Sequence, residues 1–482
     1  MKVTYQRAVL GAVIVSIVLR ARFLFSPLYA DEGGILSVAR DWSSGATLYR
    51  NVWIDRPQGL IVLFRSWDAL PGTGVSSVRM LAIVLGAVAV VAIASVGRSL
   101  FSDRVGAMAA WFTAVLTASP LLEGFASNGE LLSAGFALAA LAIVTAVFAE
   151  RCSLVLLLLA GLLLGSGLAI KQSTFDILLA VFGWLVLAWL FRWQPRQRVV
   201  ASAALLTCGI GFVLAVLAWH GSTLGWDEYW YAVAGFRLEA RSALSSPELD
   251  KLAVSLLFVL PVLLPALTLL VRTPRELALR SLLRRPHAAL IVLWTLAALF
   301  SFVTGGSFHR HYFIILAFPL AVLAALAAVK LGGSGWRHAQ VALAVTLAAA
   351  IPLIANPRLI LGDVTDTNVE LADWLNEQEA QRGPLTVYAY CADAALYSLI
   401  GQPPPFRYLW EDHVRVAEGA QDGLLQLLTG PDAPDFVLRV QPFEQCDESR
   451  TLGAAIERRY VSEGMIGEAE VLRRTDLAAT AG

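Results

Sequence analysis

Long apolar runs recur along the first 355 of the 482 residues, and they constrain the fold more than any motif does. A helix needs about 17 to 25 mostly apolar residues to cross the hydrocarbon layer of a bilayer. Eleven runs come close to that length, so we predict a polytopic α-helical membrane protein with about eleven transmembrane helices. The predicted spans are Ala8–Leu28, Val78–Gly97, Val105–Pro120, Leu131–Phe148, Leu154–Ile170, Phe175–Phe191, Val199–Trp219, Leu252–Val271, Ala288–Thr304, Tyr312–Val329 and Ala339–Ile354.

The composition of the chain changes at Asn356-Pro357. Charged residues make up only 15% of the whole chain, against about 25% in a soluble domain, but the part after this point reads like soluble protein. We therefore expect a transmembrane domain over residues 1–355 and a soluble α/β domain over 356–482. In the second domain we predict a helix near Val369–Gln381 and strands near Leu385–Tyr390 and Asp435–Val440.

The loop charges predict the orientation, because Lys and Arg are retained in the cytoplasm. With the N-terminus inside, the cytoplasmic segments hold fifteen Lys and Arg residues and the outer loops hold nine. We expect a multi-pass protein of a bacterial cytoplasmic (inner) membrane, with an extracytoplasmic C-terminal domain. Cys391 and Cys446 would then meet oxidising surroundings. A disulfide between them is the prediction, and two buried free thiols are the alternative.

The first outer loop, residues 29–77, is long and polar at its start. It opens with Asp31-Glu32-Gly33-Gly34 and continues with two stretches whose apolar residues follow helical spacing, the second of them after Pro57. Two short amphipathic helices in the membrane interface fit this pattern. Asp31 and Glu32 could be functional carboxylates, or they could cap the first helix, as acidic residues often do.

The other outer loops also carry charge at the mouths of helices. Single features have plain alternatives, such as solvated turns, or snorkelling for Arg20 and Arg22 at the end of the first span. Taken together, they place carboxylates and cations on one side of the membrane. Such a set can bind an anionic lipid headgroup and remove a proton from a hydroxyl. The residues are Glu123, Glu130, Lys171, Arg237, Arg241, His309, Arg310 and His311.

The first outer loop also resembles a known family. Asp31-Glu32, followed by Gly45, Leu48-Tyr49 and Asp55-Arg56-Pro57, is similar to the corresponding loop of the protein O-mannosyltransferase-like glycosyltransferases. That family belongs to the GT-C superfamily, which uses polyprenyl-phosphate sugars, and it includes the aminoarabinose transferases acting on lipid A. Members usually have Lys where Arg56 stands, and some have larger soluble domains. Further similar stretches are Asn128-Gly129-Glu130-Leu131, Gly161 to Gln172, Gly305 to Pro319 and Val387 to Gln402.

The resemblance implies an inverting glycosyltransferase with Asp31 as the base, Glu32 being the other catalytic candidate. The phosphate of the donor would be held by Arg56, Lys171, His309, Arg310 and His311, with Arg237 and Arg241 as weaker candidates. Contacts with the sugar or the acceptor would come from Tyr49, Asp55, Glu123, Asn128, Glu130, Gln172 and Tyr312.

The resemblance also implies the partners, which are a polyprenyl-phosphate-linked sugar donor, membrane lipid and a glycan, lipid or protein acceptor. No cofactor is predicted, although a divalent metal between Asp31, Glu32 and Glu130 stays open. Nucleic acid is not a predicted partner, because the sequence has no basic stripe that would bind it.

Two other functional classes compete with the enzyme. A transporter or flippase of lipid-linked sugars would share the charged mouths, but transporters tend to have inverted repeats and polar residues at mid-membrane. The sequence has no convincing repeat, and its mid-span positions are nearly free of charge. A non-catalytic family member is the second alternative, and the presence of Asp31, Glu32 and Arg56 disfavours it.

Overall fold

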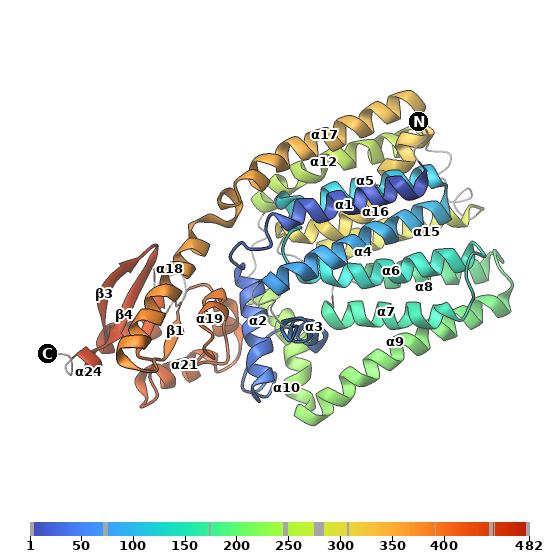
Figure 1. Cartoon of the computed structure of the whole chain (residues 1–482). Helices are drawn as coiled ribbons and strands as arrows, with labels where there is room; N and C mark the ends of the chain where they lie inside the picture. The colour runs from blue at the N-terminus through green and yellow to red at the C-terminus, as the bar shows by residue number, and fades with distance from the viewer. Residues whose placement is uncertain are drawn as a thin grey trace.

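Eleven long helices run side by side and form the larger part of the computed structural model (Figure 1). The structure describes residues 4–70, 76–172, 175–243, 249–273, 284–305, 308–390, 392–442, 447 and 449–478. The long helices are α1 (Tyr5–Ala21), α4 (Ser76–Leu100), α5 (Asp103–Thr117), α6 (Gly129–Phe148), α7 (Leu156–Ile170), α8 (Asp176–Leu190), α9 (Arg196–Leu224), α12 (Leu249–Arg272), α15 (Pro286–Gly305), α16 (Phe313–Lys330) and α17 (Gly332–Ala355).

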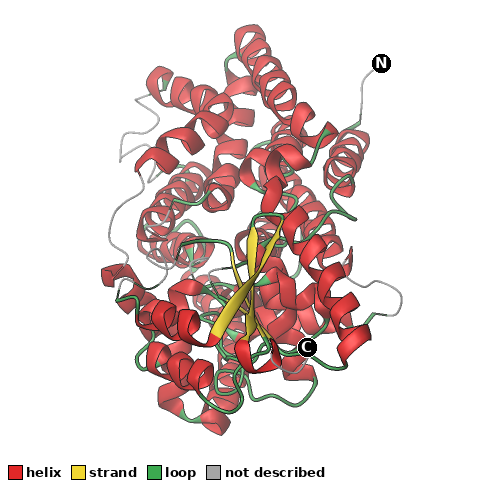
Figure 2. Cartoon of the chain, turned by 90° about the vertical axis from the view of Figure 1, so that its left-hand side faces the viewer, coloured by secondary structure: helices red, strands yellow, loops and turns green. Residues whose placement is uncertain are grey.

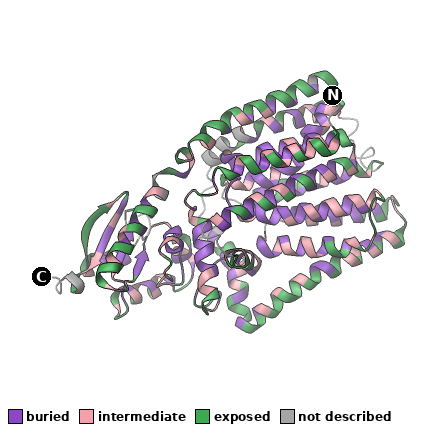
Figure 3. Ribbon diagram, viewed as in Figure 1, coloured by how far each residue is buried: buried purple, intermediate pink, exposed green. Residues whose placement is uncertain are grey.

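Each of these helices overlaps one of the eleven predicted spans, which confirms the predicted fold class, although α1 ends at Ala21, seven residues before the predicted end of its span. Six stretches of the described chain are helical, long and apolar enough to cross a membrane, namely α4, α6, α9, α15, Arg310–Lys330 and Gly335–Ala355. Burial differs strongly between them, from 89% of the apolar window around α16 to 28% for α9 and 22% for α17 (Figure 3). Thus α16 lies inside the bundle, whereas α9 and α17 present apolar surface suited to lipid.

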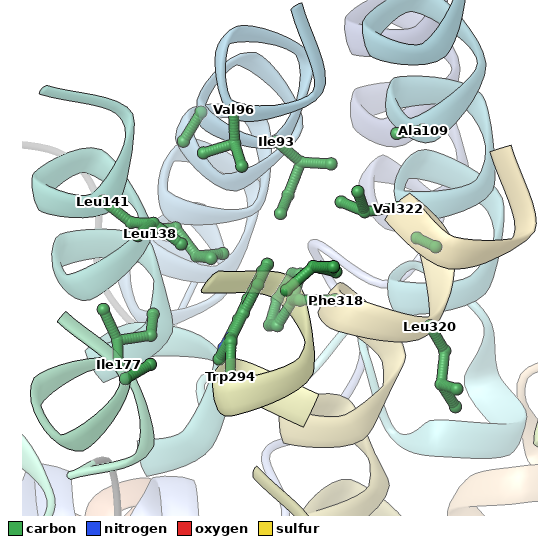
Figure 4. Packing of buried hydrophobic residues seen from close by; sticks show 14 of the residues in the cluster. Ile93, Val96, Ala109, Leu138, Leu141, Ile177, Trp294, Phe318, Leu320 and Val322 are labelled. Carbon is green, nitrogen blue, oxygen red and sulfur yellow. The ribbon is translucent and has the colours of Figure 1, made fainter. Parts of the chain in front are cut away.

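The core of the bundle is packed with apolar side chains from helices that are far apart in the sequence. Trp294 of α15 and Phe318 of α16 lie near Leu138 of α6 and Ile93 of α4 (Figure 4). All four are at most 2% exposed. In a bilayer, packing of this kind stabilises the bundle through van der Waals contacts, because lipid chains are as apolar as these side chains and supply no hydrophobic driving force between helices.

Short helices lie at the end of the bundle that faces the C-terminal domain, which we call the tail-facing end (Figure 1). Those from the first outer loop are α2 (Ala30–Ser43) and α3 (Gln58–Asp68). Between α9 and α12 lie α10 (Trp226–Trp230), a π-helical turn (Tyr231–Gly235) and α11 (Phe236–Ala243). The two short helices predicted for the first loop are therefore present. Pro57 immediately precedes α3 rather than lying in its first turn.

The C-terminal domain begins with α18 (Arg358–Arg382) and contains a four-stranded sheet (Figure 2). The strand order is β1-β2-β4-β3, with β1 (Val387–Ala389) parallel to β2 (Phe436–Arg439). The antiparallel hairpin of β3 (Tyr460–Ile466) and β4 (Ala469–Arg474) was not predicted. Most of β3 is exposed, so its sequence lacks the apolar alternation that marks a strand. Cys391 and Cys446, the predicted disulfide, lie outside the described residues.

The C-terminal domain packs tightly on the first outer loop, where α19 (Ala395–Ile400) lies beside α2 (Figure 1). A Cβ atom on Gly33 would lie 2.4 Å from the Cα of Ala395, and one on Gly34 would lie 2.5 Å from Cζ2 of Trp410. Real Cβ atoms do not come that close, so only glycine permits this approach of α2 to the C-terminal domain. Arg40 of α2 also donates a hydrogen bond to the carbonyl of Ser398 (3.0 Å).

Candidate active site

The first turn of α2 holds two neighbouring carboxylates in different surroundings. Glu32 is 1% exposed, its Oε2 lies 2.8 Å from Nη2 of Arg79, and it accepts hydrogen bonds from the backbone N–H groups of Ser127 (2.7 Å) and Tyr29 (3.3 Å). Burial raises the pKa of Glu32, although Arg79 opposes this. Asp31 is exposed, and its carboxylate makes no hydrogen bond or ion pair with any described residue. Glu32 thus caps α2, and Asp31 is left exposed.

Glu130 and Lys171 form a buried ion pair between the ends of two helices. Asn128 caps α6 by accepting a hydrogen bond from the N–H of Leu131 (2.9 Å), which places Glu130 in the first turn. Lys171 lies at the C-terminal end of α7. A Cβ atom on Gly129 would lie 2.9 Å from Cδ of Lys171, so glycine at this position leaves room for the lysine side chain to reach Glu130. The ammonium of Lys171 lies 4.7 Å from the ring centroid of Tyr312, a cation–π distance.

His311 joins this pair to Glu123 in the turn between α5 and α6. Its Nδ1 lies 2.7 Å from Oε2 of Glu123, and its Nε2 lies 3.9 Å from Oε2 of Glu130. Burial raises the pKa of Glu123, but the hydrogen bond and charge of His311 outweigh burial and leave the pKa below its usual value. Glu123 is therefore ionised at neutral pH, and it holds the imidazole toward Glu130.

Arg20 fixes the turn that carries Glu123. Its side chain is 1% exposed and donates hydrogen bonds to the carbonyls of Gly124 (2.8 Å) and Thr117 (2.6 Å). Glu123 lies between these two residues in the left-handed region, with φ 53°. Arg20 therefore does not snorkel to the interface. It satisfies carbonyls that the turn would otherwise leave unpaired.

Arg56 interacts with Asp55 of its own loop and, through its charge, with Asp31 and Glu130. Its Nη1 lies 2.6 Å from Oδ1 of Asp55, which is only 3% exposed. Burial lowers the pKa of Arg56, but the charges of Asp55, Asp31 and Glu130 raise it above the usual value. The guanidinium thus lies within the electrostatic reach of both Asp31 and the Glu130–Lys171 pair.

The predicted residues fall into two groups. One connected set, which we call the charged cluster, consists of Asp31, Arg56, Glu123, Glu130, Lys171, His311 and Tyr312. At its edge His309 stacks on His311 with a centroid distance of 5.6 Å, and the charge of Arg310 lowers the pKa of Glu123.

The other predicted residues mainly hold the loops in place. Tyr49 is buried and donates to the carbonyl of Arg56 (2.7 Å), and Gln172 donates to the carbonyl of Val233 (2.5 Å). Asn128 caps α6, as described above. Arg237 forms an ion pair with Asp55, and the side chain of Arg241 lies outside the described residues.

The sequence interpretation missed two residues, Arg79 and His413. Arg79 stands at the start of an apolar span, and a charge in that position is itself a signal of a buried partner. His413 lies in the C-terminal domain, with its Nε2 3.3 Å from Oδ1 of Asp55. Nothing in the sequence around His413 relates it to a loop more than 350 residues earlier.

The suggested metal ligands do not converge. Glu32 is occupied by Arg79, and Glu130 is occupied by Lys171. Within the described part of the chain, no group of three His, Cys, Asp or Glu side chains is arranged to hold a metal ion. The cations of the cluster are instead side chains, and these can neutralise the charge of a phosphate.

Comparison with known proteins relates the chain to solved structures by fold. No family model matches the sequence, and no curated protein sequence matches it either. The structure of ArnT from Cupriavidus metallidurans bound to undecaprenyl phosphate is similar, with a TM-score of 0.65 and 15% identity over 96% of this chain and 97% of that one. Its apo form has a TM-score of 0.66 and 14% identity, over 96% of both chains.

A second similar structure is the Archaeoglobus fulgidus oligosaccharyltransferase in its apo form. The TM-score is 0.54 and the identity 13%, over 95% of this chain and 69% of that one. The chain therefore shares the fold of ArnT over nearly its whole length, in agreement with the membrane fold that the sequence predicted.

Proposed function

We propose that this protein is an inverting glycosyltransferase that moves a sugar from a polyprenyl-phosphate donor to an acceptor hydroxyl. The observation that carries the proposal is the position of Asp31, an exposed carboxylate whose charge acts on Arg56 within the charged cluster. The fold supports it, since the similar ArnT structure was solved with undecaprenyl phosphate.

The proposed reaction is a single displacement at the anomeric carbon. The acceptor oxygen forms a bond to this carbon while the bond to the phosphate oxygen breaks, and the electron pair leaves with the phosphate. Asp31 takes the proton of the acceptor hydroxyl, as a general base. Arg56 and Lys171 stabilise the charge on the departing phosphate, so we propose that the reaction needs no metal cofactor.

The position of the reaction follows from the loop charges. The tail-facing end of the bundle carries the less basic loops, so we propose that it lies outside the cytoplasm of a bacterial inner membrane. Acceptors that reach this side include glycans, lipids and proteins.

The test combines a donor panel with a substitution. Purified protein is incubated with polyprenyl-phosphate sugars and a mixed set of hydroxyl acceptors, and release of polyprenyl phosphate is measured. Asp31→Asn keeps the shape of the side chain but cannot take a proton, so we expect turnover to fall by about 10² to 10⁴-fold. Asp41→Asn, the same change about three turns further along α2, is the matched control and should keep turnover within about twofold. Near-normal turnover of Asp31→Asn would contradict the assignment.

A further inference from the structure

The C-terminal domain reaches the segment that carries Arg56 through a short stretch of its own backbone. The N–H of Trp53 donates a hydrogen bond to the carbonyl of Arg407 (3.1 Å), and Trp53 and Tyr408 form an isolated parallel β-bridge. Their rings pack edge to face with centroids 5.1 Å apart. The C-terminal domain therefore fixes the chain two residues before Asp55.

A second contact goes directly to Asp55. His413 lies in α20 (Glu411–Val416), and its imidazole is 5% exposed. The rings of Trp53, Phe236 and Trp410 surround it, with centroid distances of 4.7, 5.1 and 5.1 Å. This packing leaves the imidazole little freedom, and its Nε2 points at Oδ1 of Asp55 over 3.3 Å.

The tautomer of His413 follows from its surroundings. Nδ1 is buried and has no hydrogen-bond partner in the described part of the chain, whereas Nε2 faces a carboxylate. A proton on Nε2 therefore gives Asp55 a donor. Burial raises the pKa of Asp55, but Arg56 and then His413 lower it to about 2, so the carboxylate is ionised when it meets both partners.

Asp55 has three charged or ring-nitrogen partners among the described residues, and they restrain it unequally. Arg56 and His413 both meet Oδ1, while Arg237, whose side chain is 43% exposed, meets Oδ2. An exposed arginine holds a carboxylate weakly, because ordering its long side chain costs entropy. The buried imidazole is the rigid partner among the three.

We propose that His413 is a positioning residue, which holds Asp55 so that the guanidinium of Arg56 faces the phosphate of the donor. The inference rests on the proposed function and deepens it, since it makes the C-terminal domain part of the donor site. Without the imidazole, Asp55 turns toward Arg56 and Arg237 and draws the guanidinium away from the phosphate.

The test uses the full-length protein and three variants. His413→Phe keeps an aromatic ring but removes the N–H, and His413→Gln places an amide N–H near the position of Nε2. Val414→Ala is the packing control, because Val414 is a buried neighbour in α20 that no described contact joins to Asp55. We expect His413→Phe to raise the KM for the donor by about ten- to a hundredfold, the range for one hydrogen bond to a charged group, with kcat changed far less. His413→Gln and Val414→Ala should stay within about threefold of the wild type.

Two kinetic results would overturn the inference. If His413→Gln or Val414→Ala raises the KM for the donor as much as His413→Phe does, then packing around position 413 and not the hydrogen bond to Asp55 determines donor binding. If all three variants match the wild type, Asp55 is held well enough by its two arginines.

A readout without turnover separates this inference from the proposed function. Hydrogen–deuterium exchange of residues 47–57 should rise in His413→Phe and stay at the wild-type level in His413→Gln. A wild-type protein that turns over no donor would count against the proposed function, while the exchange data still decide on His413. Equal exchange in all the variants would overturn its positioning role.

Discussion

The two ends of the helix bundle treat charge differently. The tail-facing end holds buried ion pairs, such as Glu32 with Arg79, whose side chains are 2% and 1% exposed, beside exposed ones such as Arg50 with Glu228 at 57% and 54%. At the opposite end the described ion pairs are at least partly exposed, such as Arg98 with Asp103 at 44% and 58%. Removing two charges from solvent costs several kcal/mol per ion, and only good geometry with further hydrogen bonds offsets this cost.

The difference shows at which end of the bundle buried charges lower the free energy of unfolding. The opposite end has pairs that solvent screens and that contribute little. The tail-facing end keeps costly buried charges where the Asp31 carboxylate and the Arg56 guanidinium must be held in fixed positions. Each prediction below tests whether the two ends differ as much as their burial indicates.

The largest effect is expected for Arg79→Met. This change leaves the carboxylate of Glu32 buried without its cation, which should cost about 3 to 5 kcal/mol of stability. Thermal unfolding in detergent, followed by the loss of helical circular dichroism, measures the effect. Adding Glu32→Gln should recover part of the loss, and a single variant as stable as the wild type would remove the contrast between the ends.

Arg56→Gln tests the function of the buried charges rather than their cost. The change removes the cation that we propose at the donor phosphate, so we expect turnover to fall by about 10² to 10³-fold. Arg56→Lys keeps the charge that members of the resembled family usually have, and it should retain most of the activity. Equal losses in both variants would mean that the shape of the guanidinium matters more than its charge.

Asp393→Asn extends the comparison to a partly buried carboxylate in the C-terminal domain that has no cation within 4 Å among the described residues. Burial raises its pKa to about 6, and the charge of Asp31 adds to this. The folded state thus favours the protonated form, so wild-type stability falls as the pH rises from about 4 to 6.

Asn cannot ionise and can still accept the hydrogen bond from Ala395, so the variant should lack this pH dependence. At pH 7 it should be more stable by about 1 to 2 kcal/mol, after allowance for partial exposure. Thermal unfolding of both proteins at pH 4 and pH 7 checks this, and a variant that is less stable at pH 7 would refute it.

The smallest effect is expected at the opposite end of the bundle. Arg98→Ala breaks an exposed ion pair with Asp103 and should cost at most about 1 kcal/mol. The same unfolding assay applies, with Arg198→Ala, which breaks the ion pair to the exposed Glu150, as a second site. A loss comparable to that of Arg79→Met would show that burial does not explain the contrast.

The membrane fold could be predicted from the sequence because the signal for a span is local. Each span is recognised from an apolar run of about 20 residues, and the apolar faces of α2 and α3 are recognised from an equally local pattern. The hairpin of β3 and β4 was missed because β3 is largely exposed and lacks that local pattern.

The candidate site was only partly predictable for the opposite reason. The residue types at the helix mouths were visible, but their pairing depends on distant segments of the chain. Glu32 pairs with Arg79, which lies 47 residues later in the sequence, whereas the neighbouring Asp31 stays exposed. Arg20 donates a hydrogen bond to the carbonyl of Thr117, which lies 97 residues later. His413 is further still from Asp55, and no motif connects them.

The close contact of Gly33 with Ala395 also sets an order of events during synthesis. At about 5 to 20 residues per second, a ribosome adds Ala395 about 20 to 70 s after Gly33. During this time α2 stands without the domain that covers it, and Asp55 lacks His413. The nascent protein therefore carries Asp31 and Arg56 from an early stage, but the contacts of Ala395 with α2 and of His413 with Asp55 form only when the last quarter of the chain has folded.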